Sequence, residues 1–96
     1  MIIKLAADQF TEDNGAYYSP GFMQDTKDTM ITVAMWLTGE AEVVMESSID
    51  QVNWVEVAGS SFNCDRIGLQ TYVECHHGIA YRIKTSGVPE QAWILA

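Results

Sequence analysis

Apolar and polar residues alternate with a period of two along most of this chain. The alternation runs through residues 31–37, 41–49, 69–76 and 79–86. Alternation of this kind is typical of strands with one buried face. Shorter strand candidates are residues 2–6, 52–58 and 92–95. Because no segment carries the apolar stripe of an amphipathic helix, the pattern predicts an all-β protein.

Residues that favour turns separate these segments. Thr38-Gly39-Glu40 predicts a tight hairpin between the first two long strands, and residues 50–53 predict the next turn. His77-Gly78 and residues 86–89 mark two more. Strands and turns at this spacing predict an antiparallel β-sandwich, jelly-roll or Ig-like, with about seven to eight strands.

Residues 8–28 form a long connection that breaks the alternation. The segment is polar and contains Gly15 and Pro20, yet it also carries several aromatic side chains, among them Tyr17, Tyr18 and Phe22. Disordered segments are poor in aromatic residues, so we expect this one to be ordered, with a short strand near residues 16–22. These three aromatic residues are candidates for contacts with a partner.

The segment Met30–Leu37 is apolar on both faces. In a sandwich the outward face of a strand should be polar, and that face would hold Met30, Ala34 and Trp36. Either the long connection or the N-terminal strand covers this row, or the row is a subunit contact, in which Met and Trp are enriched. The sequence favours neither explanation over the other.

The stretch SSIDQVNWVEV, residues 47–57, predicts a hairpin. Ser48 and Asp50 open the turn, and the carboxylate can accept hydrogen bonds from the backbone N–H groups that follow. Asn53 tolerates a left-handed backbone. Trp54 is predicted to close one end of the core.

Composition limits the classes of function. The chain has 96 residues, enough for one domain spanning residues 1–96, and five basic against thirteen acidic residues give a net charge of −8. The five basic residues are scattered, which argues against nucleic-acid binding. No segment approaches the ~20 apolar residues that span a bilayer, and the N-terminus does not resemble a signal peptide. Cys64 and Cys75 are expected to be free, buried thiols.

The sequence contains no catalytic, metal-binding or cofactor-binding motif. His76 and His77 are adjacent on a predicted strand, so their imidazoles would point to opposite faces. The acidic residues Glu40, Glu42 and Glu46 share a face that is expected to be solvated. Three tryptophans could form a sugar-binding platform, although packing in the core or an interface is the simpler explanation; they are Trp36, Trp54 and Trp93.

The order of features resembles that of small β-sandwich virion proteins of tailed bacteriophages, of the head-decoration and cement type. The resemblance covers about residues 31–96: TVAMWLTG leads into AEVVMESSIDQVNW, followed by IAYRIKTSG and AWILA. Positions matching the two family motifs are Ser48, Asp50 and Trp54, and then Gly78, Tyr81, Arg82 and Gly87. Gln51 stands where those proteins often have Gly, which affects the type of turn.

This resemblance implies a non-enzymatic virion subunit that is made in the host cytoplasm and stabilises a shell through protein–protein contacts. Its implied partners are the major capsid protein or other virion proteins, together with copies of itself, most simply as a trimer. The alternative is a carbohydrate-binding or host-attachment module of a tail or fibre, because similar sandwiches occur there too.

Overall fold

The computed structural model describes residues 2–23, 29–76 and 78–95, and of residues 29 and 71–75 it describes the backbone alone. The elements are nine strands and one short 3₁₀ turn: β1 (Ile2–Ala6), η1 (Ala7–Gln9), β2 (Thr11–Asp13), β3 (Ala16–Tyr18), β4 (Phe22–Met23), β5 (Thr29–Ser48), β6 (Val55–Glu56), β7 (Phe62–Cys75), β8 (Ala80–Thr85) and β9 (Pro89–Leu95). No helix among the described residues is long and apolar enough to cross a membrane.

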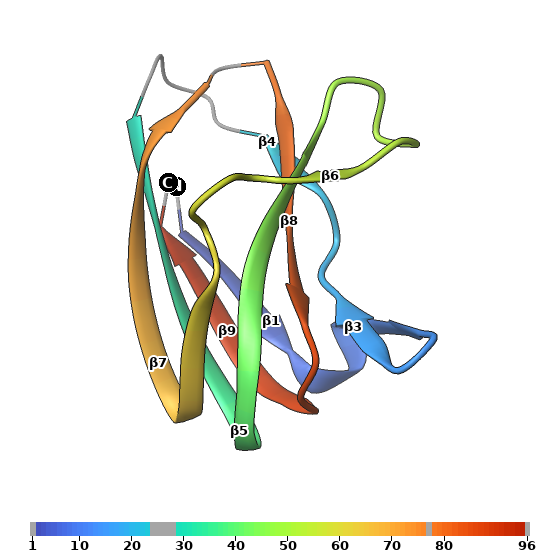
Figure 1. The fold of residues 1–96 in the computed structure, drawn as a ribbon, viewed down its shortest axis with the longest axis vertical. Helices are drawn as coiled ribbons and strands as arrows, with labels where there is room; N and C mark the ends of the chain where they lie inside the picture. The colour runs from blue at the N-terminus through green and yellow to red at the C-terminus, as the bar shows by residue number, and fades with distance from the viewer. Residues whose placement is uncertain (1, 24–28, 77, 96) are drawn as a thin grey trace.

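All nine strands belong to one antiparallel sheet that curls into a half-barrel (Figure 1). The prediction of an all-β, antiparallel chain is confirmed. β5 lies at the centre of the sheet: β7 and β6 pair along one edge, and β8 and β9 pair with successive parts of the other. The ends of the described chain lie side by side, because β1 pairs with β9 from Ile2↔Leu95 to Ala6↔Gln91.

β5 is one continuous strand of 20 residues, so the hairpin predicted at Thr38-Gly39-Glu40 is wrong. The strand bends there instead, as its downward and then upward course in Figure 1 shows. The pairing with β7 shifts register between Trp36 and Glu40. Odd-numbered side chains are buried on both sides of the bend, so a single strand can wrap its apolar face around one core.

The neighbouring strands change direction at the same level as β5. The chain passes from β8 to β9 through residues 86–88, and β7 bends near Arg66, which has a φ of 68°. The bend divides the sheet into two arms. The first arm holds β1, β9 and residues 29–37 of β5 with residues 67–75 of β7. The second arm holds β3, β4, β6 and β8 with residues 40–48 of β5 and residues 62–65 of β7.

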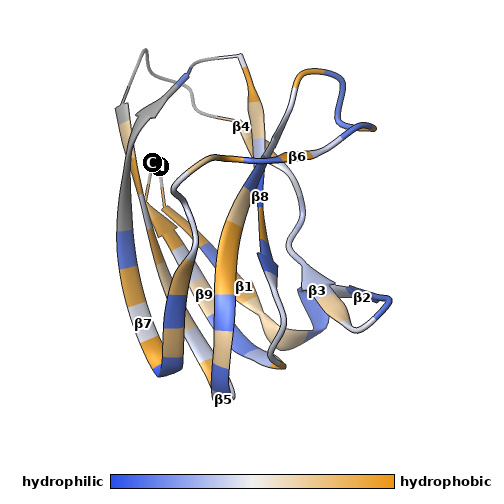
Figure 2. Ribbon diagram, in the orientation of Figure 1, coloured by the Kyte–Doolittle hydropathy of each residue, from blue (hydrophilic) through white to orange (hydrophobic). Residues whose placement is uncertain are grey.

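The hydrophobic core lies between the two arms. Figure 2 shows the alternation of apolar and polar residues along β5 and β7 that produces it. The core residues are Leu5, Phe10, Phe22, Ile31, Val33, Met35, Leu37, Val43, Met45, Cys64, Tyr81, Ile83, Ala92 and Ile94. The odd positions of β5 dominate this list, so the period-two pattern predicted the buried face of the long central strand correctly.

The long connection runs beside the second arm. Within its described part, residues 8–23, β3 and β4 pair with β8, and β2 pairs with β3. β1 lies at the edge of the first arm, alongside β9. These pairings account for the order in the connection that its aromatic residues predicted, and they place its strands away from Met30, Ala34 and Trp36.

Candidate functional site

The outward face of the first arm is built from three rows of paired residues. Residues that lie opposite each other on antiparallel strands point to the same face. The outward rows are Ile2–Leu95–Thr32, Lys4–Trp93–Ala34–Leu69 and Ala6–Gln91–Trp36–Ile67. We call the apolar residues of these rows, together with the exposed Met30 that precedes them on β5, the apolar face: Ile2, Met30, Ala34, Trp36, Ile67, Leu69, Trp93 and Leu95.

The apolar face is open to solvent. Leu69 is 67% exposed, Ile67 64% and Met30 59%, while Trp36 and Trp93 are half-buried. Lys4 is the one charged residue among the described residues of the three rows, and its Nζ lies 4.4 Å from the centre of the Trp93 ring. A contiguous apolar surface of this kind is unusual for a monomer, and this makes the apolar face the candidate contact site.

The outward face of the second arm has the opposite character. Arg82 Nε donates to Glu46 Oε1 at 2.7 Å, and Lys84 Nζ lies 3.6 Å from Glu56 Oε2. Glu46 is buried, so its predicted place on a fully solvated face is wrong, although Glu40 and Glu42 are exposed as expected. The two outer faces therefore differ sharply: one is apolar, and the other carries paired charges.

Trp54 lies on this charged outer face and does not close the core as predicted. The Arg82 guanidinium carbon lies 4.4 Å from the ring centres of both Trp54 and Tyr18. A Cβ on Gly21 would approach Trp54 Cη2 to 3.2 Å. Trp54 and Glu56 are two residues apart, so their side chains point to the same side of the chain. Glu56 pairs with Glu46, whose side chain lies on the outer face, and the Trp54 ring therefore points outwards. We call Trp54, Arg82 and Tyr18 the aromatic stack.

The aromatic residues predicted as contacts in the long connection lie elsewhere than the apolar face. Tyr18 belongs to the aromatic stack. Phe22 is buried in the core, where its ring centre lies 6.4 Å from that of Tyr81, and Tyr17 packs against the same core. Phe22 therefore stabilises the monomer, and its assignment to an interface is corrected, while the interface role of the half-buried Tyr17 stays a prediction. Of the six predicted contact residues, Met30, Ala34 and Trp36 are the ones that share one surface.

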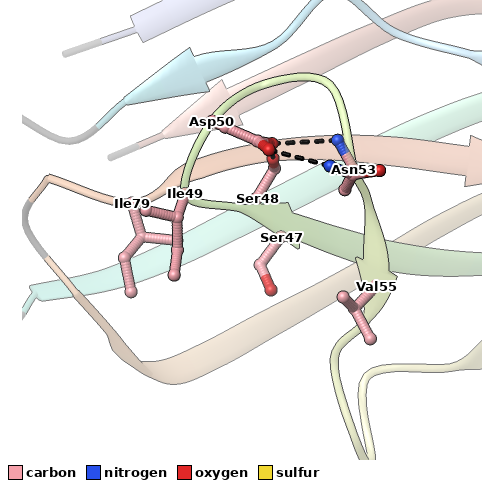
Figure 3. Close-up of a pocket in the computed structure, with 7 residues that line it drawn as sticks. All are labelled: Ser47, Ser48, Ile49, Asp50, Asn53, Val55 and Ile79. Carbon is pink, nitrogen blue, oxygen red and sulfur yellow. Dashed lines mark hydrogen bonds between the residues drawn. The ribbon is translucent and has the colours of Figure 1, made fainter.

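The turn between β5 and β6 is held by a single carboxylate. Asp50 Oδ1 accepts hydrogen bonds from the backbone N–H groups of Val52 and Asn53 and from Ser48 Oγ, each at 2.9 Å. Asp50 Oδ2 accepts from Asn53 Nδ2 at 2.9 Å (Figure 3). These donors hold the pKa of Asp50 well below its usual range. The predicted role of Asp50 is confirmed.

The left-handed residue of this turn is Gln51, with a φ of 61°, and not Asn53 as predicted. Gln51 Nα–H donates to Ser48 Oγ at 2.8 Å, which fixes the chain just before the strained residue. A glycine would adopt this backbone without a steric penalty.

A hollow of about 390 Å³ opens beside the turn (Figure 3). It is lined by Ser47, Ser48, Ile49, Asp50, Asn53, Val55 and Ile79. Ile49 is 90% exposed and Val55 66%, and Val52 at the tip of the turn is 76% exposed. The sequence pattern did not predict these exposed aliphatic residues, because alternation alone does not reveal which side chains extend past the end of the sheet.

The remaining candidate residues form no site in the described part of the chain. Groups of three or more His, Cys, Asp or Glu that could hold a metal ion are absent among the described residues. Cys64 is a free, buried thiol, as expected, and burial together with the nearby Asp65 raises its pKa. The backbone N–H of His76 donates to the Tyr81 hydroxyl at 2.8 Å. His77 and the side chain of Cys75 lie outside the described residues.

Comparisons with protein-family models, with curated proteins and with solved structures gave no match.

Proposed function

We propose that this protein is a non-enzymatic structural subunit of a phage virion, of the decoration or cement type. It associates with copies of itself through the apolar face, most simply as a cyclic trimer, and holds shell proteins together by burying protein surface. In this proposal the two arms of the bent sheet act as the two layers of a β-sandwich of the jelly-roll or Ig-like kind.

The observation that carries the proposal is the contrast between the outer faces of the two arms. The second arm covers its outer face with ion pairs and the aromatic stack. The first arm leaves aliphatic and aromatic side chains exposed over three adjacent rows. The chain has a net charge of −8, yet none of the described residues in those rows is acidic. Such a surface is suited to burial in an interface.

Substitution of Leu69 tests the self-association. Leu69 is largely exposed in the monomer, so Leu69→Glu leaves the fold intact but places an unpaired charge in the contact. We expect sedimentation to show an oligomer for the natural chain and a monomer for Leu69→Glu, with unchanged circular dichroism. Val52→Glu is the matched control, because Val52 is exposed to a similar degree but lies at the hairpin tip. A monomeric natural chain at all concentrations contradicts this part of the proposal.

Location in purified particles tests the role in the virion. The proposal expects the protein on the head of intact particles and expects particles that lack it to lose their genome at a lower temperature. Its absence from particles, or its presence on a tail fibre alone, overturns the decoration role.

A carbohydrate-binding module is the second candidate, because Trp36 and Trp93 share the apolar face. Trp93 pairs with Ala34, two residues from Trp36 along β5, so the two rings are diagonal neighbours. Adjacent aromatic rings on a flat face can stack against sugar rings. Titration of tryptophan fluorescence with a panel of glycans separates the candidates: saturable quenching that is lost in Trp36→Ala supports the carbohydrate function.

A further inference from the structure

The open end of the bent sheet, opposite the bend, carries a second exposed surface that the proposed function does not use. Ile49, Val52 and Val55 lie within seven residues of each other at the β5–β6 turn, and each is at least 66% exposed. Ile49 and Val55 line the hollow in Figure 3 together with Ile79 and Asp50, and Val52 lies at the tip of the turn between them. We call Ile49, Asp50, Val55 and Ile79 the hairpin surface.

The hairpin surface is held rigid before any partner arrives. Asp50 fixes the turn through four hydrogen bonds. Just after the turn, Trp54 stacks on Arg82, which is itself bonded to Glu46. A surface that is already ordered avoids much of the entropy cost of binding. The aliphatic residues are therefore presented at fixed positions rather than on a loose loop.

The charge around the hollow favours a basic partner. None of the described residues that line the hollow is basic, and the Asp50 carboxylate stands at its rim. The nearby cations Arg82 and Lys84 are paired with Glu46 and Glu56 on the outer face of the second arm. A second copy docked by the same surface would bring its own Asp50 carboxylate against this one, so local like charges disfavour it as the occupant.

The size of the hollow favours one side chain of an extended segment. Its volume of about 390 Å³ is near the lower end of the ~300–1,000 Å³ usual for small-ligand sites. The side chains of Ser48, Asp50 and Asn53 at its rim are already bonded within the turn, so recognition there would come mainly from apolar contact and from charge. This combination fits a peptide segment with an apolar side chain between basic ones.

We propose that the hairpin surface binds an extended segment of a partner protein in which a leucine-sized or aromatic side chain is flanked by Lys or Arg. The inference rests on the proposed function and deepens it: the apolar face joins copies of this chain, and the hairpin surface grips the shell protein. The two contacts lie on different parts of the molecule, so one can be lost without the other.

Titration of the ¹⁵N-labelled protein with short capped peptides tests this inference. Three probes are used: a pentapeptide with leucine between two pairs of lysines, the same peptide with glycine in place of leucine, and the leucine peptide with glutamates in place of lysines. We expect the first to shift the amide signals of Ile49, Asp50, Val55 and Ile79 saturably, with a millimolar dissociation constant. The other two should bind at least about threefold more weakly.

Two variants test whether the peptide binds at the hairpin surface or non-specifically to exposed apolar residues. Ile49→Ser should weaken binding of the leucine peptide at least about threefold without changing the fold, because Ile49 is almost fully exposed. Val88→Ser is the control, since Val88 is an exposed aliphatic residue at the bend, and it should bind the peptide normally. Equal binding of all three peptides, no saturable shift, or an unchanged affinity in Ile49→Ser overturns the inference.

Two further outcomes identify other occupants and also overturn it. If the peptide shifts only the amide signals of the apolar face, the peptide-binding site lies on that face. Concentration-dependent shifts of the hairpin signals without peptide would make a second copy the occupant. Absence of the protein from particles overturns the proposed function and leaves the peptide result standing, so the two failures are distinguishable.

Discussion

At the scale of single residues, Asp50 shows how one side chain can fix a turn and make it sensitive to pH. Its folded pKa lies below the ordinary value of 3.8, because four donors stabilise the charged form. A carboxyl with a lowered folded pKa stabilises the native state above that ordinary value, and the contribution is lost as the pH falls through the folded pKa.

We therefore predict that Asp50→Asn is less stable than the natural chain at neutral pH and that the difference shrinks below about pH 4. The asparagine keeps one acceptor but has no charge and cannot accept from Asn53 Nδ2. Urea unfolding of both proteins from neutral pH to about pH 3 measures the difference. A difference that stays constant over this range contradicts the electrostatic explanation.

Gln51 adopts a left-handed backbone that costs a residue with a Cβ about 1–2 kcal/mol. Glycine avoids that cost but loses about 0.5–1 kcal/mol to its greater freedom when unfolded. We predict that Gln51→Gly stabilises the protein by up to about 1 kcal/mol, measured by chemical denaturation. Gln51→Ala is the control, because it keeps the Cβ and should give no such gain.

Trp54 packs on the surface of the sheet, so its removal should cost less than the loss of a core tryptophan. Its main contact is the Arg82 guanidinium, and cation–π contacts of this kind contribute about 0.5–2 kcal/mol. We predict that Trp54→Ala lowers the free energy of unfolding by about 1–2 kcal/mol, against about 3–5 for a core aromatic. A loss in the larger range would place the ring in the core after all.

Local chemistry predicted part of this turn and not the rest. The role of Asp50 follows from its position alone, since a carboxylate opening a turn can reach the N–H groups two and three residues further on. Which residue adopts the left-handed backbone depends on the length of the loop between β5 and β6, and the sequence pattern did not define that length. The direction of Trp54 depends on the pairing of Glu56 with Glu46, a contact between strands.

At the scale of elements, the bend depends on close contact between two small residues. Gly87, in the β8–β9 connection, lies against Ala41 of β5: a Cβ on Gly87 would be 2.5 Å from the Ala41 Cβ. The β8–β9 connection can therefore lie this close to β5 only if one of these two residues has no side chain.

We predict that Gly87→Ala lowers the free energy of unfolding by about 1–3 kcal/mol through overpacking. The double variant Gly87→Ala with Ala41→Gly should recover most of the loss, apart from about 0.5–1 kcal/mol for a glycine within a strand. Thermal unfolding of the two single variants and the double variant measures the coupling. Additive losses would show that this contact does not limit the bend.

Alternation predicted the buried side of β5 but not its continuity. A glycine flanked by Thr38 and Glu40 is typical of a hairpin, and a bend within a strand uses the same residues. The informative feature was the numbering of the apolar positions. They stay odd from Ile31 to Met45, as expected if one continuous strand keeps the same face towards the core. The extent of β7, which begins at Phe62, was underestimated because Arg66 and Gly68 interrupt its pattern.

At the scale of the whole molecule, the apolar face joins residues from β1, β5, β7 and β9. The sequence revealed only the row on β5, Met30, Ala34 and Trp36. Ile67, Leu69 and Trp93 come from other strands, and their place beside that row depends on registers between segments far apart in the chain. Surfaces assembled in this way cannot be read from local patterns.

Self-association through the apolar face should make stability depend on protein concentration. Binding between folded copies stabilises the native state by mass action. We predict that the thermal midpoint of the natural chain rises with concentration and that the midpoint of Leu69→Glu does not. Scanning calorimetry over a hundredfold range of concentration provides the measurement. A constant midpoint for the natural chain contradicts association of folded copies over that range.

The pairing of the two chain ends has a consequence for aggregation. Among the described residues β1 pairs with β9 alone, so local fraying of these five residues detaches it without disturbing the bend or the aromatic stack. The β9 edge thus exposed is a template of unpaired backbone groups beside Trp93 and Leu95, and the β1 of another molecule can complete it. Strand exchange between neighbours is then a route from this fold to a polymer that does not require global unfolding.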